Sequence, residues 1–157
     1  MRLEYFQLID RIVELNLPER RIRTEATVPL TSSIFEGHFP GFPIMPGVLL
    51  LESMAQTAGW LVIATTRFER MPFLASMKEV KLRTFVSPGQ RLSISALLEH
   101  EGSGFAVAEA EVKSDDKSVC NANITFRVVP FPADDLRVHM KDMAARLEFP
   151  MGTLANG

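Results

Sequence analysis

The stretch that decides the fold is residues 46–66, which read PGVLLLESMAQTAGWLVIATT. Proline is favoured at the first position of a helix, and the residues that follow are apolar on nearly every side. A surface helix is apolar along one stripe only, so the pattern predicts a helix that is enclosed all round. One carboxylate, Glu52, lies among these apolar residues. A fold gains no stability from burying it, so we expect Glu52 to have a chemical role.

The segments on both sides of this helix alternate between apolar and polar side chains, as strands do. Residues 11–17 and 21–28 are expected to form an N-terminal hairpin. Four later segments are separated by short turn sequences and predict an antiparallel meander of consecutive strands. They are residues 73–85, 91–101, 105–113 and 118–129. The fold class is therefore α+β, with one curved antiparallel sheet wrapped around one long central helix.

The length of the chain, 157 residues with 46% hydrophobic, suits one domain with a substantial core and is too short for two ordinary domains. We expect that domain to span residues 1–132 and a C-terminal region to span residues 133–157. Apolar residues recur there at helical spacing and predict an amphipathic helix that packs on the sheet or on a neighbouring subunit. They are Leu136, Met140, Met143 and Leu147. The tail from residue 149 onward carries Pro, Gly and Asn and is expected to fray.

Composition excludes several classes of function. A net charge of -2 and a pI near 5.9 argue against a nucleic-acid binder, because such domains usually carry a strongly basic face. The lone Cys120 excludes an intrachain disulfide and leaves no cluster of Cys and His for a metal. It is expected to be a small core residue on a strand, in a protein of the reducing cytoplasm.

The N-terminal residues lack the basic region, apolar stretch and cleavage site of a signal peptide, so we expect no export and a cytoplasmic location. Only residues 47–66 approach the length of a membrane span. Polar residues occupy the first two turns of this stretch, and strand-like segments flank it instead of aromatic or basic anchors. A buried core helix is therefore expected there, and no membrane span.

The loop before the helix, residues 35–47 with the sequence FEGHFPGFPIMPG, carries the groups for proton chemistry. Its prolines and glycines fix an unusual backbone path. His38 suits a general base near neutral pH, and an apolar site favours the protonated form of a carboxyl group such as Glu52. The start of the helix at Gly47 offers unpaired N–H groups to an oxyanion. This set suits proton abstraction next to a thioester carbonyl, with loss or gain of water at the next carbon.

These motifs resemble the FabZ-type 3-hydroxyacyl-acyl carrier protein dehydratases. The resemblance rests mainly on the motif within residues 37–56, which matches at many positions and without gaps. It extends over roughly residues 5 to 130. The matching segments are 37–49, 52–56, 8–15, 77–83 and 86–89. It implies a hot-dog fold, a tunnel for the acyl chain, and a dimeric active site with the histidine from one protomer and the glutamate from the other. It further implies acyl carrier protein as the partner, with no metal and no dissociable cofactor.

The resemblance assigns roles to four residues. The catalytic base falls on His38 and the acid on Glu52, which stand 14 positions apart. Gly47 falls on the backbone donor to the thioester carbonyl, and Gln56, one turn after Glu52, could orient the carboxyl group or a water. Related dehydratase-isomerases carry aspartate where Glu52 stands, so glutamate favours the simple dehydratase. His38 would remove a proton from C2 and Glu52 would protonate the C3 hydroxyl, leaving a trans-2-enoyl thioester.

Further residues are predicted to contact the substrate and its carrier. The predicted lining of the tunnel is Phe39, Pro46, Met54, Trp60 and Phe73. Core packing alone explains Met54 and Trp60 equally well. An acidic carrier would need a local positive surface, and the candidates for it on one strand are Lys78, Lys81 and Arg83. The alternative for these three is a solvated strand face.

The chain departs from the family pattern in a few places. Met71 and Pro72 stand where many members have a tyrosine pair, Phe85 replaces a proline, and Gln90 replaces an aspartate. These differences suggest a specialised branch, and the N-terminus and tail resemble members that serve very-long-chain acyl carriers in rhizobial lipid A assembly. The oligomer is expected to be a homodimer or a trimer of dimers.

Two alternative functions stay open at the level of sequence. A hot-dog acyl thioesterase needs a carboxylate to activate water, but it does not need the histidine-bearing loop. A non-catalytic acyl-binding subunit would keep the fold without the chemistry, and the presence of both His38 and Glu52 argues against it. The sequence does not indicate the acyl chain length.

Overall fold

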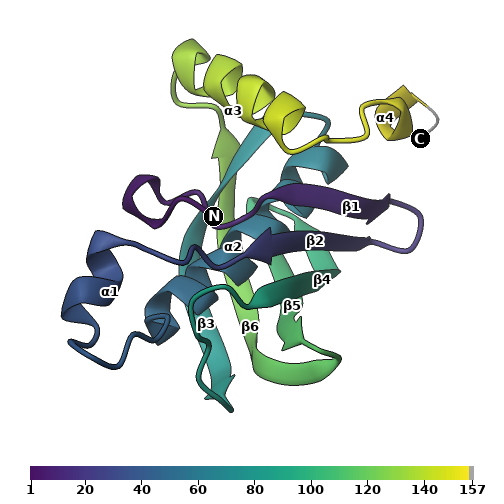
Figure 1. The fold of residues 1–157 in the computed structure, drawn as a ribbon. Coiled ribbons are helices and arrows are strands. Elements are labelled where there is room, and N and C mark those ends of the chain that lie inside the picture. The colour runs from purple at the N-terminus through teal and green to yellow at the C-terminus, as the bar shows by residue number, and fades with distance from the viewer. Residues whose placement is uncertain (156–157) are drawn as a thin grey trace.

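In a computed structural model, which describes residues 1–155, one antiparallel sheet curves around the long helix α2 (Gly47–Thr65) (Figure 1). The strands of the sheet are β1 (Arg11–Asn16), β2 (Arg21–Thr27), β3 (Arg70–Leu82), β4 (Arg91–Gly102), β5 (Phe105–Ser114) and β6 (Lys117–Pro130). The other helical segments are η1 (Leu3–Tyr5), α1 (Ser33–Gly37), α3 (Asp134–Arg146) and α4 (Gly152–Ala155). The predicted α+β hot-dog fold is confirmed.

The strand order in the sheet is β1-β2-β4-β5-β6-β3, so β3 lies at one edge beside β6. The predicted hairpin β1–β2 is confirmed, and β4, β5 and β6 form a meander. The predicted meander of four strands is wrong, because β3 pairs with β6 and not with β4. Residues 83–90 between β3 and β4 are too long for a tight hairpin turn. Val86 is buried in this connection, and its carbonyl accepts a hydrogen bond from the Met45 N–H at 2.8 Å.

The core lies between the sheet and α2. Alternate residues of β5 are buried, and three of them are alanines (Ala106, Ala108 and Ala110), whose small side chains leave room for the helix. The buried hydroxyls of Thr24 on β2 and Thr57 on α2 are 2.8 Å apart and satisfy each other. By length and composition α2 could cross a membrane, but 72% of its most apolar window is buried inside the fold. The prediction of an enclosed core helix is therefore confirmed.

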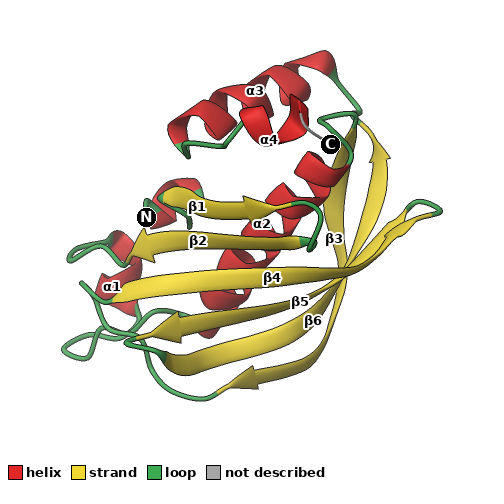
Figure 2. Ribbon diagram, turned by 90° about the vertical axis from the view of Figure 1, so that its right-hand side faces the viewer, coloured by secondary structure: helices red, strands yellow, loops and turns green. Residues whose placement is uncertain are grey.

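The predicted C-terminal helix is present as α3, which crosses the end of the sheet and of α2 (Figure 2). The expectation that the tail frays from residue 149 is wrong at its start, because Phe149 is buried against Trp60 and Phe68. Residues 152–155 form α4, and residues 156–157 lie outside the described part of the chain. Cys120 is a core residue on β6, as predicted, and burial raises the pKa of its thiol to about 11.

Candidate active site

A short helix and a tight loop hold His38 in place. The Ser32 hydroxyl caps α1 by accepting a hydrogen bond from the Ile34 N–H at 3.1 Å, and the His38 N–H donates back to the Ile34 carbonyl at 2.9 Å. Beyond the helix, Phe39 and Phe42 exchange two backbone hydrogen bonds of 2.9 Å each. The loop therefore reverses direction within a few residues, as its prolines and glycines predict.

The imidazole of His38 is oriented by the same loop. Its Nδ1 lies 3.0 Å from the carbonyl oxygen of Ile44, and its ring stacks on Phe39 with centroids 4.0 Å apart. A carbonyl oxygen can only accept, so the neutral ring carries its proton on Nδ1. The Nε2 atom is then left with a free lone pair, which is the state that a general base requires.

Gly47 opens α2 beside this histidine. Together with His38, Phe39 and Arg83 it lines a cavity of about 540 Å³. Within residues 1–155, no acceptor takes the Gly47 N–H. A Cβ atom at this position would lie 2.8 Å from Leu82 Cδ1, so the glycine allows the Leu82 side chain to pack directly against the start of the helix. A backbone donor of this kind can bind an oxyanion.

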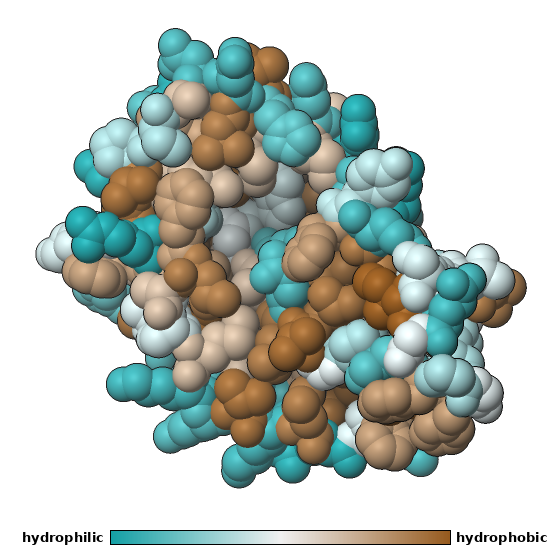
Figure 3. All heavy atoms as spheres, turned by 90° about the vertical axis from the view of Figure 1, so that its left-hand side faces the viewer, coloured by the Kyte–Doolittle hydropathy of each residue, from teal (hydrophilic) through white to brown (hydrophobic). Residues whose placement is uncertain are grey.

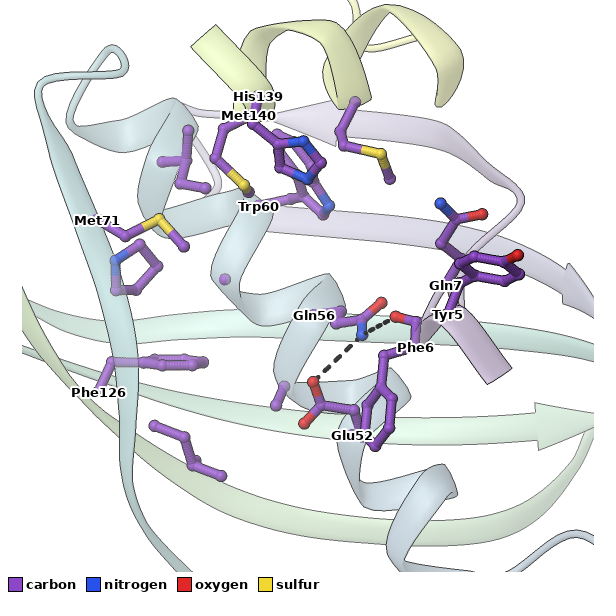
Figure 4. A pocket seen from close by; sticks show the side chains of 16 residues that line it. Tyr5, Phe6, Gln7, Glu52, Gln56, Trp60, Met71, Phe126, His139 and Met140 are labelled. Atoms are coloured by element: carbon purple, nitrogen blue, oxygen red, sulfur yellow. Dashed lines mark hydrogen bonds between the residues drawn. The ribbon is translucent and has the colours of Figure 1, made fainter. Parts of the chain in front are cut away.

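Glu52 projects from the second turn of α2, and Gln56 holds it. The Gln56 Nε2 donates to Glu52 Oε1 at 3.2 Å and to the Phe6 carbonyl at 2.7 Å (Figure 4). Its Oε1 accepts from the Leu8 N–H at 3.3 Å. The amide of Gln56 is thus fixed by the backbone of the N-terminal segment. Because Oε1 of Glu52 is occupied as an acceptor, Oε2 is the oxygen that can carry a proton.

His38 and Glu52 lie in different cavities of the protomer. Glu52 and Gln56 line a cavity of about 430 Å³ that extends along α2, while His38 lines the cavity at the start of that helix. On the side where α1 lies in Figure 1, hydrophobic surface surrounds a hollow (Figure 3). One protomer therefore presents a base and an acid without bringing them into one cavity.

Comparison with known proteins identifies the relatives of this chain. The family model of the FabA-like domain matches residues 2–123. The chain belongs to the FabA-like family. A curated relative from Lactobacillus helveticus, named 3-hydroxyacyl-[acyl-carrier-protein] dehydratase FabZ, is 36% identical over 125 residues, which are 79% of this chain and 83% of the relative. A FabZ from Polynucleobacter necessarius is 36% identical over 78% of this chain and 83% of the relative. The FabZ resemblance is confirmed, and the lipid A branch stays a prediction.

Solved structures support the fold of this FabA-like chain. A conserved protein from Pseudomonas aeruginosa superposes with a TM-score of 0.63 at 24% identity, covering 80% of this chain and 91% of that protein. A thioesterase from Haemophilus influenzae superposes with a TM-score of 0.60 at 11% identity. The superposition covers 78% of this chain and 79% of the thioesterase. At these identities the likeness concerns the fold alone.

The predicted tunnel residues are distributed unevenly over this FabA-like fold. Trp60 lines the cavity of Glu52, and Phe39 lines the cavity of His38. Pro46 caps α2 and lines neither of these cavities. Met54 is fully buried in the core, because two residues after Glu52 correspond to a turn of about 200° around the helix.

Phe73 on β3 also lines neither cavity, although its neighbours Pro72 and Leu74 line the cavity of Glu52. Successive strand residues face opposite sides of a sheet, so Phe73 faces away from that cavity. Met71 lines the cavity despite this alternation, which places the unusual Met71-Pro72 pair at its wall.

The three candidate docking cations, Lys78, Lys81 and Arg83, are all exposed on the end of β3 and the residue after it. Arg83 lies nearest to the chemistry, because it lines the cavity of His38 and donates to Asn121 Oδ1 at 2.9 Å. An irregularity of the β3–β6 pairing between Lys78 and Lys81 breaks the alternation of side chains there.

Sequence reasoning missed two groups of residues around Glu52. The N-terminal segment contributes Tyr5, Phe6 and Gln7 to the cavity, and α3 contributes His139, Met140 and Met143. The helical spacing of Met140 and Met143 indicated a buried face on α3, but the sequence carried no signal for what that face contacts. Among residues 1–155, no three His, Cys, Asp or Glu side chains gather as a metal site would require.

Proposed function

We propose that this protein dehydrates 3-hydroxyacyl chains carried by acyl carrier protein, with His38 as base and Glu52 as acid. The observation that carries the proposal is the hydrogen bond from His38 Nδ1 to the Ile44 carbonyl, which leaves Nε2 free in the same cavity as the Gly47 N–H. A base and an oxyanion donor side by side suit removal of a proton next to a thioester carbonyl. The curated FabZ relatives are named for this reaction.

The reaction converts a 3-hydroxyacyl thioester into a trans-2-enoyl thioester and water. His38 Nε2 takes a proton from C2, while the Gly47 N–H donates to the thioester oxygen as negative charge builds on it. The electron pair of the broken C2–H bond forms the double bond to C3. The hydroxyl group leaves C3 with a proton from Glu52 Oε2. The proton on His38 returns to Glu52 through solvent, which restores both groups.

The complete site requires a second copy of the chain. β3 is an edge strand with unpaired backbone groups along its outer side, which favours pairing with another strand. Large apolar side chains are exposed beside the His38 cavity, including Leu82 at 53% and Phe85 at 68%. Exposed apolar surface of this extent marks an interaction site. A homodimer pairing at β3 would cover it and bring His38 of one copy toward Glu52 of the other.

The activity is tested with 3-hydroxyacyl and trans-2-enoyl thioesters of acyl carrier protein. We expect the protein to interconvert the two, which hydration and dehydration assays monitor from either side. Absence of interconversion at every chain length would overturn the proposal. The profile over chain lengths also tests the predicted very-long-chain branch of lipid A assembly.

The shared site is tested by mixing two inactive variants. In a dimer of His38→Ala with Glu52→Gln, one site keeps both intact residues and the other loses both. Co-expression should therefore restore about a quarter of the parent activity, since about half of the dimers are mixed and each has one working site. If both residues of one site came from the same chain, mixing would restore nothing.

The hot-dog thioesterase remains the second candidate, since the fold of this protein is shared with thioesterases. A thioesterase would release free thiol from an acyl thioester, and a thiol-specific reagent detects that product directly. We expect no release above the uncatalysed rate, because His38 Nε2 is placed to take a proton from carbon without any need for an attacking water.

A further inference from the structure

The cavity that begins at Glu52 ends at a helix outside the matched family domain. His139 and Met140 of α3 lie at the end of the cavity far from Glu52 (Figure 4), and Met143 of the same helix also lines it. The family model matches residues 2–123, and α3 spans Asp134–Arg146. This wall of the cavity therefore lies outside the residues that the family model matches.

The cavity follows one face of α2. The helix residues that line it are spaced three and four apart, so they form a continuous stripe. They are Glu52, Ala55, Gln56, Gly59, Trp60 and Ile63. At about 1.5 Å of rise per residue, the stripe from Glu52 to Ile63 extends roughly 16 Å. Gly59 faces Pro72 across the cavity, and a Cβ there would be in ordinary contact with Pro72 Cγ at 3.7 Å. Such a groove fits a linear apolar chain.

The helix α3 is fixed firmly enough to act as a wall. Just beyond it, Phe149 packs against Phe68 and Trp60, with ring centroids 5.3 Å and 6.1 Å apart. The Leu147 carbonyl accepts a hydrogen bond from the Ile12 N–H on β1 at 2.8 Å. Ala144 is also buried. The helix is therefore joined both to the sheet and to the end of α2.

The side chains that α3 turns toward the cavity suit contact with a flexible hydrocarbon. Met140 and Met143 are half-buried, and their unbranched thioethers adapt to irregular apolar shapes. The charged residues Lys141 and Asp142 are exposed and do not line the cavity. Without the methionines, the end of an acyl chain beyond Trp60 would meet water.

We propose that α3 is the distal wall of the acyl channel, and that Met140 and Met143 determine the longest acyl chain that the enzyme processes efficiently. The proposal rests on the proposed dehydratase function and adds the element that sets its chain-length specificity. The occupant is the substrate's own acyl chain, because the cavity is continuous with the candidate acid Glu52.

The test compares kcat/KM for 3-hydroxybutyryl and 3-hydroxypalmitoyl acyl carrier protein in the parent and in Met143→Trp. The larger side chain should block the distal channel and lower the long-to-short ratio of kcat/KM by about tenfold or more, since small volume changes in an apolar pocket discriminate by that order. The matched control is Val138→Trp, which adds similar bulk on the 58% exposed face of the same helix. It should leave the ratio unchanged.

A second variant guards against a folding defect in the first. Met140→Asp places a charge at a half-buried position on the wall and should also lower the ratio, because the long acyl chain would have to pack against that charge. Equal effects on both substrates by two folded variants, or no effect on either, would overturn the proposal. A parent that processes neither substrate would instead overturn the proposed function, so the two failures are distinguishable.

Discussion

The two ends of α2 are completed in different ways. At its N-terminal end the Gly47 N–H has no acceptor among the described residues 1–155, a cavity is open beside His38, and Val48 is 70% exposed. At its C-terminal end Trp60 and Phe68 are buried under Phe149, which the chain itself supplies from beyond α3. The N-terminal end (the open end) presents the catalytic groups and leaves apolar surface exposed. The C-terminal end (the closed end) is buried by aromatic packing that stabilises the fold. Activity and stability should therefore respond to substitutions at opposite ends of the same helix.

The largest effect is expected at the open end, for His38→Ala. Loss of the general base should lower kcat by about 10²–10⁴-fold. The free energy of unfolding should fall by only about 1 kcal/mol, the value of the hydrogen bond to Ile44. Steady-state kinetics and thermal denaturation of the same preparation measure both quantities. His100→Ala, at an exposed histidine on β4, is the control and should alter neither.

The converse effect is expected at the closed end, for Phe149→Ala. Removal of this buried ring from its contacts with Trp60 and Phe68 should lower the free energy of unfolding by roughly 3–5 kcal/mol. Urea denaturation measures the loss, and kcat for a short-chain substrate should be retained below the new Tm. Phe105→Ala, at a 45% exposed ring on β5, should cost much less. Equal losses in the free energy of unfolding for Phe149→Ala and Phe105→Ala would contradict a special role of the closed end in stability.

An intermediate effect is expected for Gln56→Ala, which lies between the two ends. Removing the amide frees Glu52 from its 3.2 Å hydrogen bond and should lower kcat roughly tenfold, the order expected for one hydrogen bond to the neutral carboxyl group of the acid. KM should stay nearly constant, because Gln56 acts on the acid and not on the carrier. Gln7→Ala removes a neighbouring amide that lines the same cavity and serves as the control. A rise in KM with constant kcat would contradict the positioning role.

The smallest effect is expected for Lys81→Glu. This variant tests whether acyl carrier protein docks near the open end of α2. Charge reversal should raise KM for the acyl carrier protein substrate about threefold to tenfold at low salt, and less at high salt, because exposed charges are screened. A small thioester analogue should be processed as by the parent. Lys117→Glu, an exposed lysine at the start of β6, is the matched control. Equal losses on both substrates would count against docking at β3.

The central helix could be predicted from sequence because its evidence is local. The apolar character of residues 46–66 on every side already indicates that the helix is enclosed by the rest of the fold. Each flanking strand is predicted by its own alternation of apolar and polar side chains. The place of β3 could not be predicted, because alternation does not name a strand's partner. The connection from β3 to β4 is held by a contact between distant parts of the chain, in which Val86 is buried and its carbonyl accepts from the Met45 N–H.

The residues of the candidate site also fall into two groups, those that the local sequence predicts and those that depend on contacts between distant parts of the chain. His38, Gly47 and Glu52 were predictable from the loop and helix motif, and the angular position of Met54 on α2 could have been worked out from helix geometry. The hydrogen bonds of Phe6 and Leu8 to Gln56 could not be predicted from sequence. They are made by a backbone carbonyl and a backbone N–H, which nearly every residue has. The turn-favouring residues after Phe149 predict a frayed tail, whereas the burial of its ring depends on Trp60, which is distant in the sequence.

The hydrogen bonds between Gln56 and the N-terminal segment have a consequence for how this protein can diverge. Since they use only main-chain atoms of Phe6 and Leu8, mutational drift can alter the exposed side chain of Phe6 without moving the acid. Proline at position 8 is the exception, because it would delete the N–H that Gln56 accepts. Among descendants that keep the reaction, side chains at the exposed positions of this segment should vary widely while its main-chain path persists, and proline should be missing from position 8.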